Sequence, residues 1–164
     1  MHSHGFYCPA TINLGGKILN INKPVVLGVI NLSQDSFYSG SAFHDQETIL
    51  KRVTEMLEEG AAVIDIGAVS TRPGAKAVSE SEEIKRLSVG LEAIRKNFPE
   101  IPISIDTFNV NVLKEVAHFN IHMVNDISGG NEEMYEWVAE NHLPYILMHM
   151  KGNPETMKSM AQYE

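Results

Sequence analysis

Five short apolar runs, separated by segments with helical spacing of their apolar residues, constrain the fold of this chain more than any other feature. The runs are residues 25–30, 62–66, 101–105, 122–124 and 145–148. Each has the length of one strand and the composition of a strand that is buried on both faces. Strands that alternate with amphipathic helices predict a parallel sheet with helical crossovers.

The segments between the runs carry signals for the start of a helix. Asp45 is a candidate cap for the first helix, and Ser79 with Glu82 has the spacing of a capping box before the second. Asn109 and Asn131 precede the third and fourth amphipathic segments. The sequence therefore predicts four helices, each beginning near one of these residues.

A hairpin is predicted ahead of the first apolar run. Residues 12–14 and 17–19 are short strand-like segments, and two glycines separate them. We expect this hairpin to cap the amino-terminal end of the sheet. The predicted organisation is a single domain, with a hairpin segment at residues 1–24 and five strand–helix units at residues 25–164.

Two architectures fit this alternation. A doubly wound five-stranded sheet suits 164 residues, whereas a (β/α)₈ barrel needs about 250 residues. A self-contained sheet is expected to end with a covering helix, but only one or two helical turns can follow the fifth run. We therefore interpret the fold class as α/β, a (β/α)₈ barrel truncated to its first five units.

Composition excludes some classes of partner. Thirteen basic residues against 21 acidic ones give a net charge of -8, which argues against binding to nucleic acid or to an anionic membrane. No apolar stretch approaches the ~18 residues of a membrane span. The amino terminus has no signal-peptide pattern, and Cys8 is the only cysteine, so we expect a cytoplasmic protein.

Polar residues follow each of the five runs. They are Asn31 with Asp35, Thr71 with Arg72, Asp106, Asn125 with Asp126, and His149. Alone, each has a structural explanation as a helix cap, a turn residue or a packed strand end. Together they predict one functional rim, because the carboxyl ends of parallel strands meet at the same edge. Asp65 lies inside a run, and a structural hydrogen-bonding role is expected there.

Five segments in order resemble the dihydropteroate synthase family. They read VLGVINLSQDSF at 26–37, IDIGAVSTRPGA at 64–75, SIDT at 104–107, VNDISG at 124–129 and LMHM at 147–150. The chain departs from the family at Ser33-Gln34, where Thr-Pro is usual. Family members also continue through a sixth strand with an aspartate, and then through strands that carry a lysine and an arginine cluster. The resemblance implies the first five units of a TIM barrel.

The resemblance implies a transferase of folate biosynthesis. The reaction joins 6-hydroxymethyl-7,8-dihydropterin pyrophosphate to p-aminobenzoate and releases pyrophosphate. Asp106 and Asn125 would hydrogen-bond the pterin, while Ile127 and Met148 would pack against its ring. Asp106 would be ionised, and as a catalytic residue it would stabilise the positive charge left on the ring when pyrophosphate departs.

The same resemblance implies Mg²⁺ as cofactor and a second set of site residues. Asn31 would help to hold the metal ion bound to pyrophosphate. Thr71 and Arg72 would bind the departing pyrophosphate, since arginine offers a planar pair of donors. Asp35 and Phe37 would help to form the p-aminobenzoate pocket, and Asp35 and Arg72 would take part in catalysis. The family's members are also sulfonamide targets.

Two alternatives stay open at this point. A methyltetrahydrofolate:corrinoid methyltransferase shares the pterin-binding strand ends, but it should lack the Ser-Thr-Arg-Pro-Gly loop that this chain has at 70–74. A non-catalytic barrel fragment is the second alternative. We expect residual ligand recognition without useful turnover. We also expect a homodimer or other self-association, because a truncated barrel leaves its first and fifth strands unpaired at their outer edges.

Overall fold

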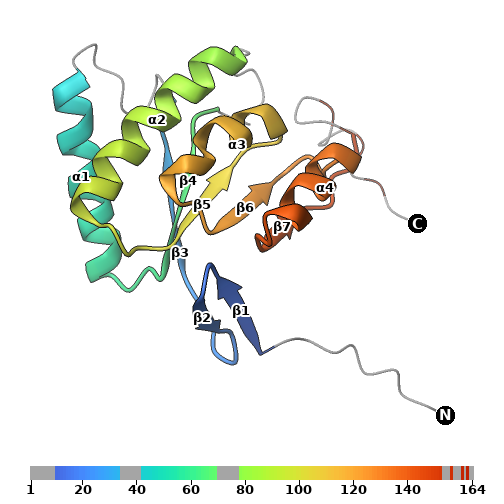
Figure 1. Cartoon of the computed structure of the whole chain (residues 1–164), viewed down its shortest axis with the longest axis horizontal. Helices are drawn as coiled ribbons and strands as arrows, with labels where there is room; N and C mark the ends of the chain where they lie inside the picture. Colours follow the sequence, from blue (N-terminus) through green and yellow to red (C-terminus); the bar gives the residue numbers. More distant parts are fainter. Residues whose placement is uncertain are drawn as a thin grey trace.

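The computed structural model describes residues 10–33, 42–69, 78–152, 156, 160 and 162, and the backbone alone for 42–45. Its main feature is a five-stranded parallel sheet in the order β3-β4-β5-β6-β7 (Figure 1). The strands are β3 (Leu27–Asn31), β4 (Val63–Gly67), β5 (Ile103–Asp106), β6 (Met123–Asp126) and β7 (Tyr145–Leu147). Each predicted apolar run contributes one strand, and chain order is sheet order.

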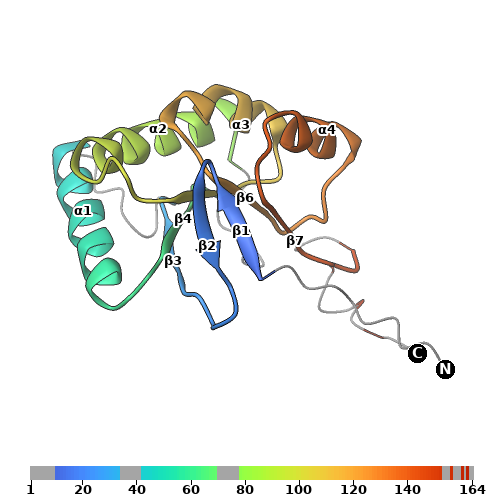
Figure 2. The same cartoon turned by 60° about the horizontal axis from the view of Figure 1, so that its bottom comes forward.

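Four α-helices lie on one face of this sheet (Figure 2). They are α1 (Ala42–Glu58), α2 (Glu80–Asn97), α3 (Val110–Val116), which continues into a 3₁₀ turn at Ala117–Phe119, and α4 (Glu132–Glu140). A doubly wound sheet carries helices on both faces, so that alternative is wrong and the barrel interpretation is confirmed. In the described part of the chain, no helix combines the length and apolar character that crossing a membrane requires.

Side-chain caps begin the last two helices as predicted. The Asn109 amide oxygen accepts a hydrogen bond from the backbone N–H of Asn111 at 3.0 Å. The Asn131 amide oxygen accepts one from the backbone N–H of Met134 at 2.9 Å. Each bond satisfies one of the backbone donors that a helix start leaves without an intrahelical partner.

The first two helix starts depart from prediction. Ser79 Oγ accepts from the Glu82 backbone N–H at 3.3 Å, but the Glu82 carboxylate pairs with Arg86 at 2.9 Å, so half of the capping box forms. Helix α1 begins at Ala42, three residues before Asp45. The cap assigned to Asp45 is therefore wrong. Aspartate is also favoured inside a first turn, where it faces the positive end of the helix dipole.

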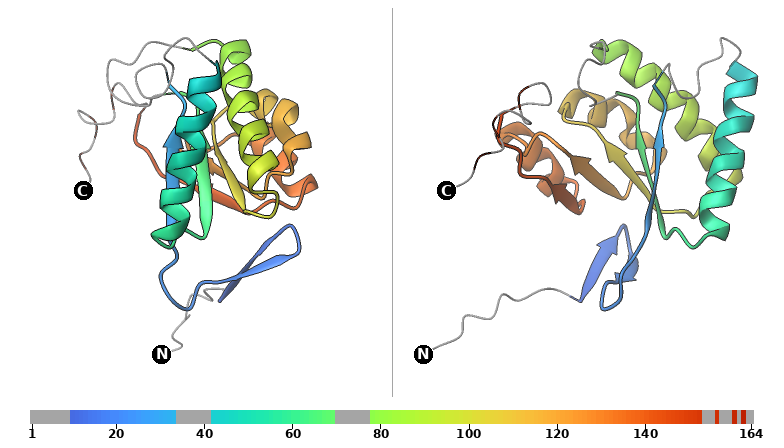
Figure 3. Two further views of the ribbon diagram at one scale, coloured as in Figure 1. Left: turned by 90° about the vertical axis from the view of Figure 1, so that its left-hand side faces the viewer. Right: turned by 180° about the vertical axis from the view of Figure 1, so that it is seen from behind.

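The predicted hairpin covers the amino-terminal end of the sheet (Figure 3). Its strands are β1 (Thr11–Leu14) and β2 (Lys17–Asn20), paired antiparallel. Gly15 and Gly16 form the turn with φ of +62° and +99°, a conformation that favours glycine. Leu14 is buried against Val63 and Met123, the first residues of β4 and β6. The hairpin therefore closes the end opposite to the polar strand ends.

The two faces of the parallel sheet differ in character. On one face, isoleucines and valines of the strands pack against the helices; the buried ones include Ile30, Ile64, Ile66, Ile105 and Val124. Side chains alternate along a strand, so their neighbours point to the other face. Val29, Asp65 and Ser104 are register partners on that second face. Among the described residues no helix covers this concave side of the sheet, and the polar residues gather there.

Candidate functional site

Asp106 and Asn125 lie side by side at the carboxyl ends of β5 and β6. They are register partners in adjacent parallel strands, so their side chains leave the sheet on the same face. Gly67 is the partner of Asp106 on β4. A Cβ atom at Gly67 would lie 3.2 Å from Asp106 Oδ2 and 3.3 Å from Asp106 Cβ, so the glycine leaves room for this carboxyl group. The expected proximity of Asp106 and Asn125 is confirmed.

Asp65 lies on the same face of the sheet, on β4, two residues before Gly67. Its side chain is 2% exposed, and its Oδ2 accepts a hydrogen bond from Asn125 Nδ2 at 3.0 Å. The hydrogen bond expected of Asp65 is therefore present. Two further buried atoms, Asp65 Oδ1 and Ser104 Oγ, have no hydrogen-bond partner among the described residues. Three neighbouring strands thus contribute polar side chains to one buried patch.

The electrostatics of the patch act most strongly on Asp106. Burial, followed in order of effect by the nearby carboxylates of Asp65, Asp126 and Glu83, raises the pKa of Asp106 from 3.8 to about 7. The ligand-free chain therefore holds a proton on Asp106 more readily than a free aspartic acid does, and the ionised form expected beside a positively charged ring stays a prediction.

A buried carboxylate on α2 supports the rim and was missed by sequence reasoning. Glu83 is 4% exposed and accepts a 2.6 Å hydrogen bond from the hydroxyl of Thr107, the residue after β5. Burial raises the pKa of Glu83, and the Thr107 hydrogen bond partly offsets that effect. The available signal was spacing, because Glu83 lies four residues before the buried Leu87 on the same helix face.

Asn31 ties the end of β3 to the chain that follows β4. Its Nδ2 donates to the backbone oxygen of Val69 at 3.1 Å, and its Oδ1 accepts from the backbone N–H of Ser33 at 2.9 Å. Arg86 also holds this segment by donating to the Ala68 oxygen at 3.2 Å. These bonds fix the backbone at Ala68 and Val69, just before Thr71 and Arg72 in the sequence.

The Asn31 side chain fits a supporting role in a magnesium site. Its Oδ1 retains a second lone pair, and amide oxygen is a hard ligand of the type that Mg²⁺ prefers. The described residues contain no cluster of three or more histidine, cysteine, aspartate or glutamate side chains that could hold a metal ion. Mg²⁺ commonly takes few protein ligands and completes its shell with water and substrate phosphate. The amide oxygen of Asn31 is consistent with a Mg²⁺ site to which the protein supplies few ligands.

The remaining predicted site residues divide into two groups. Ile127 is half-buried in the turn after β6, and Met148, 38% exposed, directly follows β7. Both stand at the same edge of the sheet as Asp106 and Asn125. The other group lies outside the described residues: Asp35, Phe37, Thr71 and Arg72.

Asp126 and Tyr145 fix the turn that carries Ile127. Asp126 is fully buried; its Oδ1 accepts from the Ser128 backbone N–H and its Oδ2 from the Tyr145 hydroxyl, each at 2.7 Å. Burial, together with the hydrogen bond to Asp126, raises the pKa of the Tyr145 hydroxyl, so it stays a donor. Asp126 therefore positions the turn. The sequence marked it as a strand-end residue and gave no sign of its tyrosine partner.

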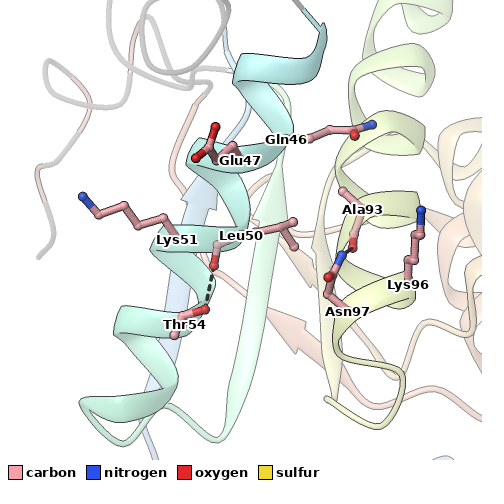
Figure 4. A pocket seen from close by; sticks show the side chains of 8 residues that line it. All are labelled: Gln46, Glu47, Leu50, Lys51, Thr54, Ala93, Lys96 and Asn97. Atoms are coloured by element: carbon pink, nitrogen blue, oxygen red, sulfur yellow. Dashed lines mark hydrogen bonds between the residues drawn. The ribbon is translucent and has the colours of Figure 1, made fainter.

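A groove of about 580 Å³ lies between α1 and α2, on the helical side of the sheet (Figure 4). Two of its polar side chains bond to their own helices: Thr54 Oγ1 to the Leu50 oxygen at 2.9 Å and Asn97 Nδ2 to the Ala93 oxygen at 2.8 Å. Lys51 and Lys96, which also line it, do not converge on a common point. We therefore place the candidate site at the carboxyl ends of the strands and not in this groove.

Comparison with known sequences gives a consistent family. Residues 27–164 match the pterin binding enzyme family. Dihydropteroate synthase of Synechocystis is 38% identical over 160 residues, and that of Escherichia coli is 40% identical over 150 residues. These matches cover 96% and 91% of this chain but 55% and 53% of the relatives. The mitochondrial folate synthesis bifunctional protein of Arabidopsis thaliana is 43% identical over 159 residues, 92% of this chain and 28% of its own length.

Solved structures show the same similarity in three dimensions. Dihydropteroate synthase of Yersinia pestis in a sulfonamide drug complex superimposes with a TM-score of 0.82 at 37% identity, over 94% of this chain and 56% of that one. The Xanthomonas albilineans enzyme with 4-aminobenzoic acid gives 0.78 at 33% identity, over 87% and 52%. The chain thus spans about half the length of these TIM-barrel relatives, and it belongs to the pterin-binding enzyme family.

Proposed function

We propose that this chain carries the pterin-binding part of a dihydropteroate synthase active site. The reaction is the condensation of 6-hydroxymethyl-7,8-dihydropterin pyrophosphate with p-aminobenzoate to 7,8-dihydropteroate and pyrophosphate. The observation that carries the proposal is the adjacent pair Asp106 and Asn125 on a buried polar patch. Identity of 38–40% to enzymes named dihydropteroate synthase supports it.

The pair offers the chemistry that a pterin ring edge requires. A pterin presents neighbouring N–H donors and a carbonyl acceptor along its pyrimidine edge. The Asp106 carboxylate accepts hydrogen bonds, while the Asn125 amide both donates and accepts. Ile127 and Met148 stand at the same rim and would pack against the faces of the ring. Polar recognition at the edge and apolar contact on the faces is the usual division in a ligand site.

Asp106 would also act on the charge that develops in the reaction. Departure of pyrophosphate from the pterin methylene leaves positive charge on the ring, which favours the ionised form of a carboxyl group beside it. With a pKa of about 7, Asp106 can take that form at neutral pH at little cost. Asp106 would then be both a binding and a catalytic residue.

The residues that follow β3 and β4 in the sequence would bind the leaving group and the nucleophile. Mg²⁺, when bound, would neutralise charge on the pyrophosphate, and Asn31 would help to hold the ion. Thr71 and Arg72 would hold the pyrophosphate oxygens, while Asp35 and Phe37 would position p-aminobenzoate. The aromatic amine is already neutral at pH 7, so positioning and exclusion of water supply the remaining acceleration without a strong general base.

The proposal predicts pterin binding with little turnover by the 164-residue chain. The resemblance places further charged groups in the part of the family that this chain does not match, and loss of one preorganised group can cost about 10²–10³ in rate. Calorimetry with 6-hydroxymethyl-7,8-dihydropterin, followed by a steady-state assay with both substrates and Mg²⁺, would measure both quantities. The E. coli enzyme is the positive control. Absence of pterin binding would reject the proposed function, and turnover close to the control would reject the need for those groups.

We also propose self-association through the two edges of the described sheet. Val29 on β3 is 59% exposed and Leu147 on β7 is 56% exposed, and unpaired apolar edges favour pairing with another chain. Leu147→Lys is expected to weaken association about tenfold, because a charge at an edge strand must be desolvated on pairing. Glu136→Lys, at an exposed position of α4, is the matched control. Sedimentation over a concentration series would measure both, and a wild-type monomer throughout the series would contradict the proposal.

A further inference from the structure

A hydrogen bond crosses one complete strand of the sheet beneath the proposed pterin site. Asp65 lies on β4 and Asn125 on β6, with β5 between them. Their side chains nevertheless meet at 3.0 Å, Nδ2 to Oδ2. Adjacent strands are about 4.8 Å apart, so two strands are bridged because the face curves toward the inside of the barrel. This contact is a feature of the curved sheet.

The chemistry of the contact fixes the orientation of the Asn125 amide. Asp65 Oδ2 accepts this hydrogen bond, and an asparagine presents an oxygen on one side and an NH₂ group on the other. Asn125 must therefore turn its NH₂ group toward Asp65, as the structure has it. With the amide rotated by half a turn, two oxygens would oppose one another in a buried environment. Asp65 thus removes one of the two orientations that Asn125 could adopt.

This orientation determines what the rim offers to a ligand. With one N–H of Asn125 bonded to Asp65, the amide oxygen and the second N–H remain for other partners. Beside them stands the Asp106 carboxylate, the register partner of Asn125. The resulting pattern of acceptor, acceptor and donor matches a ring edge that carries two N–H donors and one carbonyl. A freely rotating amide would match a ring with the opposite pattern equally well.

A purely structural role explains Asp65 poorly. The carboxylate is 2% exposed, yet Asn125 gives it one hydrogen bond and its Oδ1 has none among the described residues. Its cross-strand neighbour Ser104, fully buried, also keeps its Oγ without a partner there. A buried polar group with few hydrogen bonds lowers stability. Such a group is expected where a site requires it in spite of that cost.

We propose that Asp65 is a positioning residue, which selects pterin-type rings by locking the Asn125 amide in one orientation. The inference rests on the proposed function, since it assigns the ring-recognition step of that same site. Asp65 acts through Asn125 and makes no direct contact with the ligand. Its effect on binding must therefore depend on the presence of the asparagine.

A double-mutant cycle tests this dependence. The variants are Asp65→Ala, Asn125→Ala and the combination, with affinity for 6-hydroxymethyl-7,8-dihydropterin measured by calorimetry. Asp65→Ala is expected to weaken binding about tenfold in the wild-type background and less than about twofold in the Asn125→Ala background. Equal losses in both backgrounds would overturn the inference, because they would show that Asp65 acts independently of Asn125.

Two controls separate the inference from stability effects and from failure of the proposed function. Val63→Ala removes buried side-chain volume from the same strand beside the hairpin, and it should leave pterin affinity within about twofold.

The Asn125 side-chain amide can also be followed by NMR without any ligand. Its NH₂ protons are expected to be protected from exchange in the wild type and unprotected in Asp65→Ala. Unprotected protons in the wild type would overturn the inference, whereas protected protons in a chain that binds no pterin would reject the proposed function alone.

Discussion

Replacing Asp106 with asparagine is expected to stabilise the chain by about 2 kcal/mol at pH 8 and to weaken pterin binding about 30-fold. In the folded chain the pKa of Asp106 is raised from 3.8 to about 7, chiefly by burial and then by Asp65. That difference corresponds to about 4 kcal/mol, and solvent at the strand end screens part of it. A neutral amide of the same shape avoids the cost, but it cannot supply a charged acceptor to the ring.

The sign of the pH dependence follows from the direction of the shift. Between pH 3.8 and about 7 the folded chain binds more protons at Asp106 than the unfolded chain does. The free energy of unfolding of the wild type therefore falls as the pH rises through this window. Asp106→Asn does not titrate, so its advantage over the wild type should grow from pH 4 to pH 7 and stay constant above pH 7.

Urea unfolding of both chains at pH 4, 6 and 8 would measure this difference. Glu136→Gln, at an exposed position of α4, serves as the control for removing one acidic group, and it should change stability by less than about 0.5 kcal/mol. A constant difference between Asp106→Asn and the wild type across this range would show that Asp106 is ionised in the fold at pH 4. A gain in stability together with a loss of binding would identify a carboxylate retained for function.

Replacing Arg95 with alanine is expected to lower the free energy of unfolding by about 3 kcal/mol. The guanidinium of this α2 residue donates to four backbone oxygens, those of Phe119, Pro99, Ile101 and Asn120, at 2.5–3.2 Å. It also lies 3.2 Å from Nδ1 of His122, just before β6. One side chain thus holds together the approaches to β5 and β6, and its loss leaves several acceptors without a donor.

Matched substitutions separate this network from the general effect of removing an arginine. Arg52 on α1 forms an exposed ion pair with Glu55 at 3.1 Å, with side chains 44% and 42% exposed. Arg52→Ala should cost less than about 0.5 kcal/mol. Arg95→Lys should recover less than half of the loss, because an ammonium group cannot reproduce the planar set of five donors. Urea unfolding would compare the three variants, and equal costs for Arg95→Ala and Arg52→Ala would show that the network contributes little.

The sequence by itself determined the order of elements and the neighbours of Asp106. Apolar runs predict strands, and parallel strands in chain order bring Asp106 and Asn125 to one rim whatever the details of packing. The caps at Asn109 and Asn131 were equally predictable from the sequence, because each hydrogen bond joins residues no more than three positions apart. The first helix start was not, since an aspartate suits both a cap and a first turn.

Only the tertiary structure decided which face the helices cover, which hydrogen bonds the carboxyl groups of the rim make, and how far the pKa of Asp106 is raised. Asp65 and Asn125 are 60 residues apart, and their hydrogen bond exists because the sheet curves across β5. The pKa of Asp106 depends on its burial and on three carboxylates from β4, β6 and α2. Local sequence patterns encode backbone conformation over a few residues, whereas desolvation and charge repulsion depend on distances that exist only after the strands have packed.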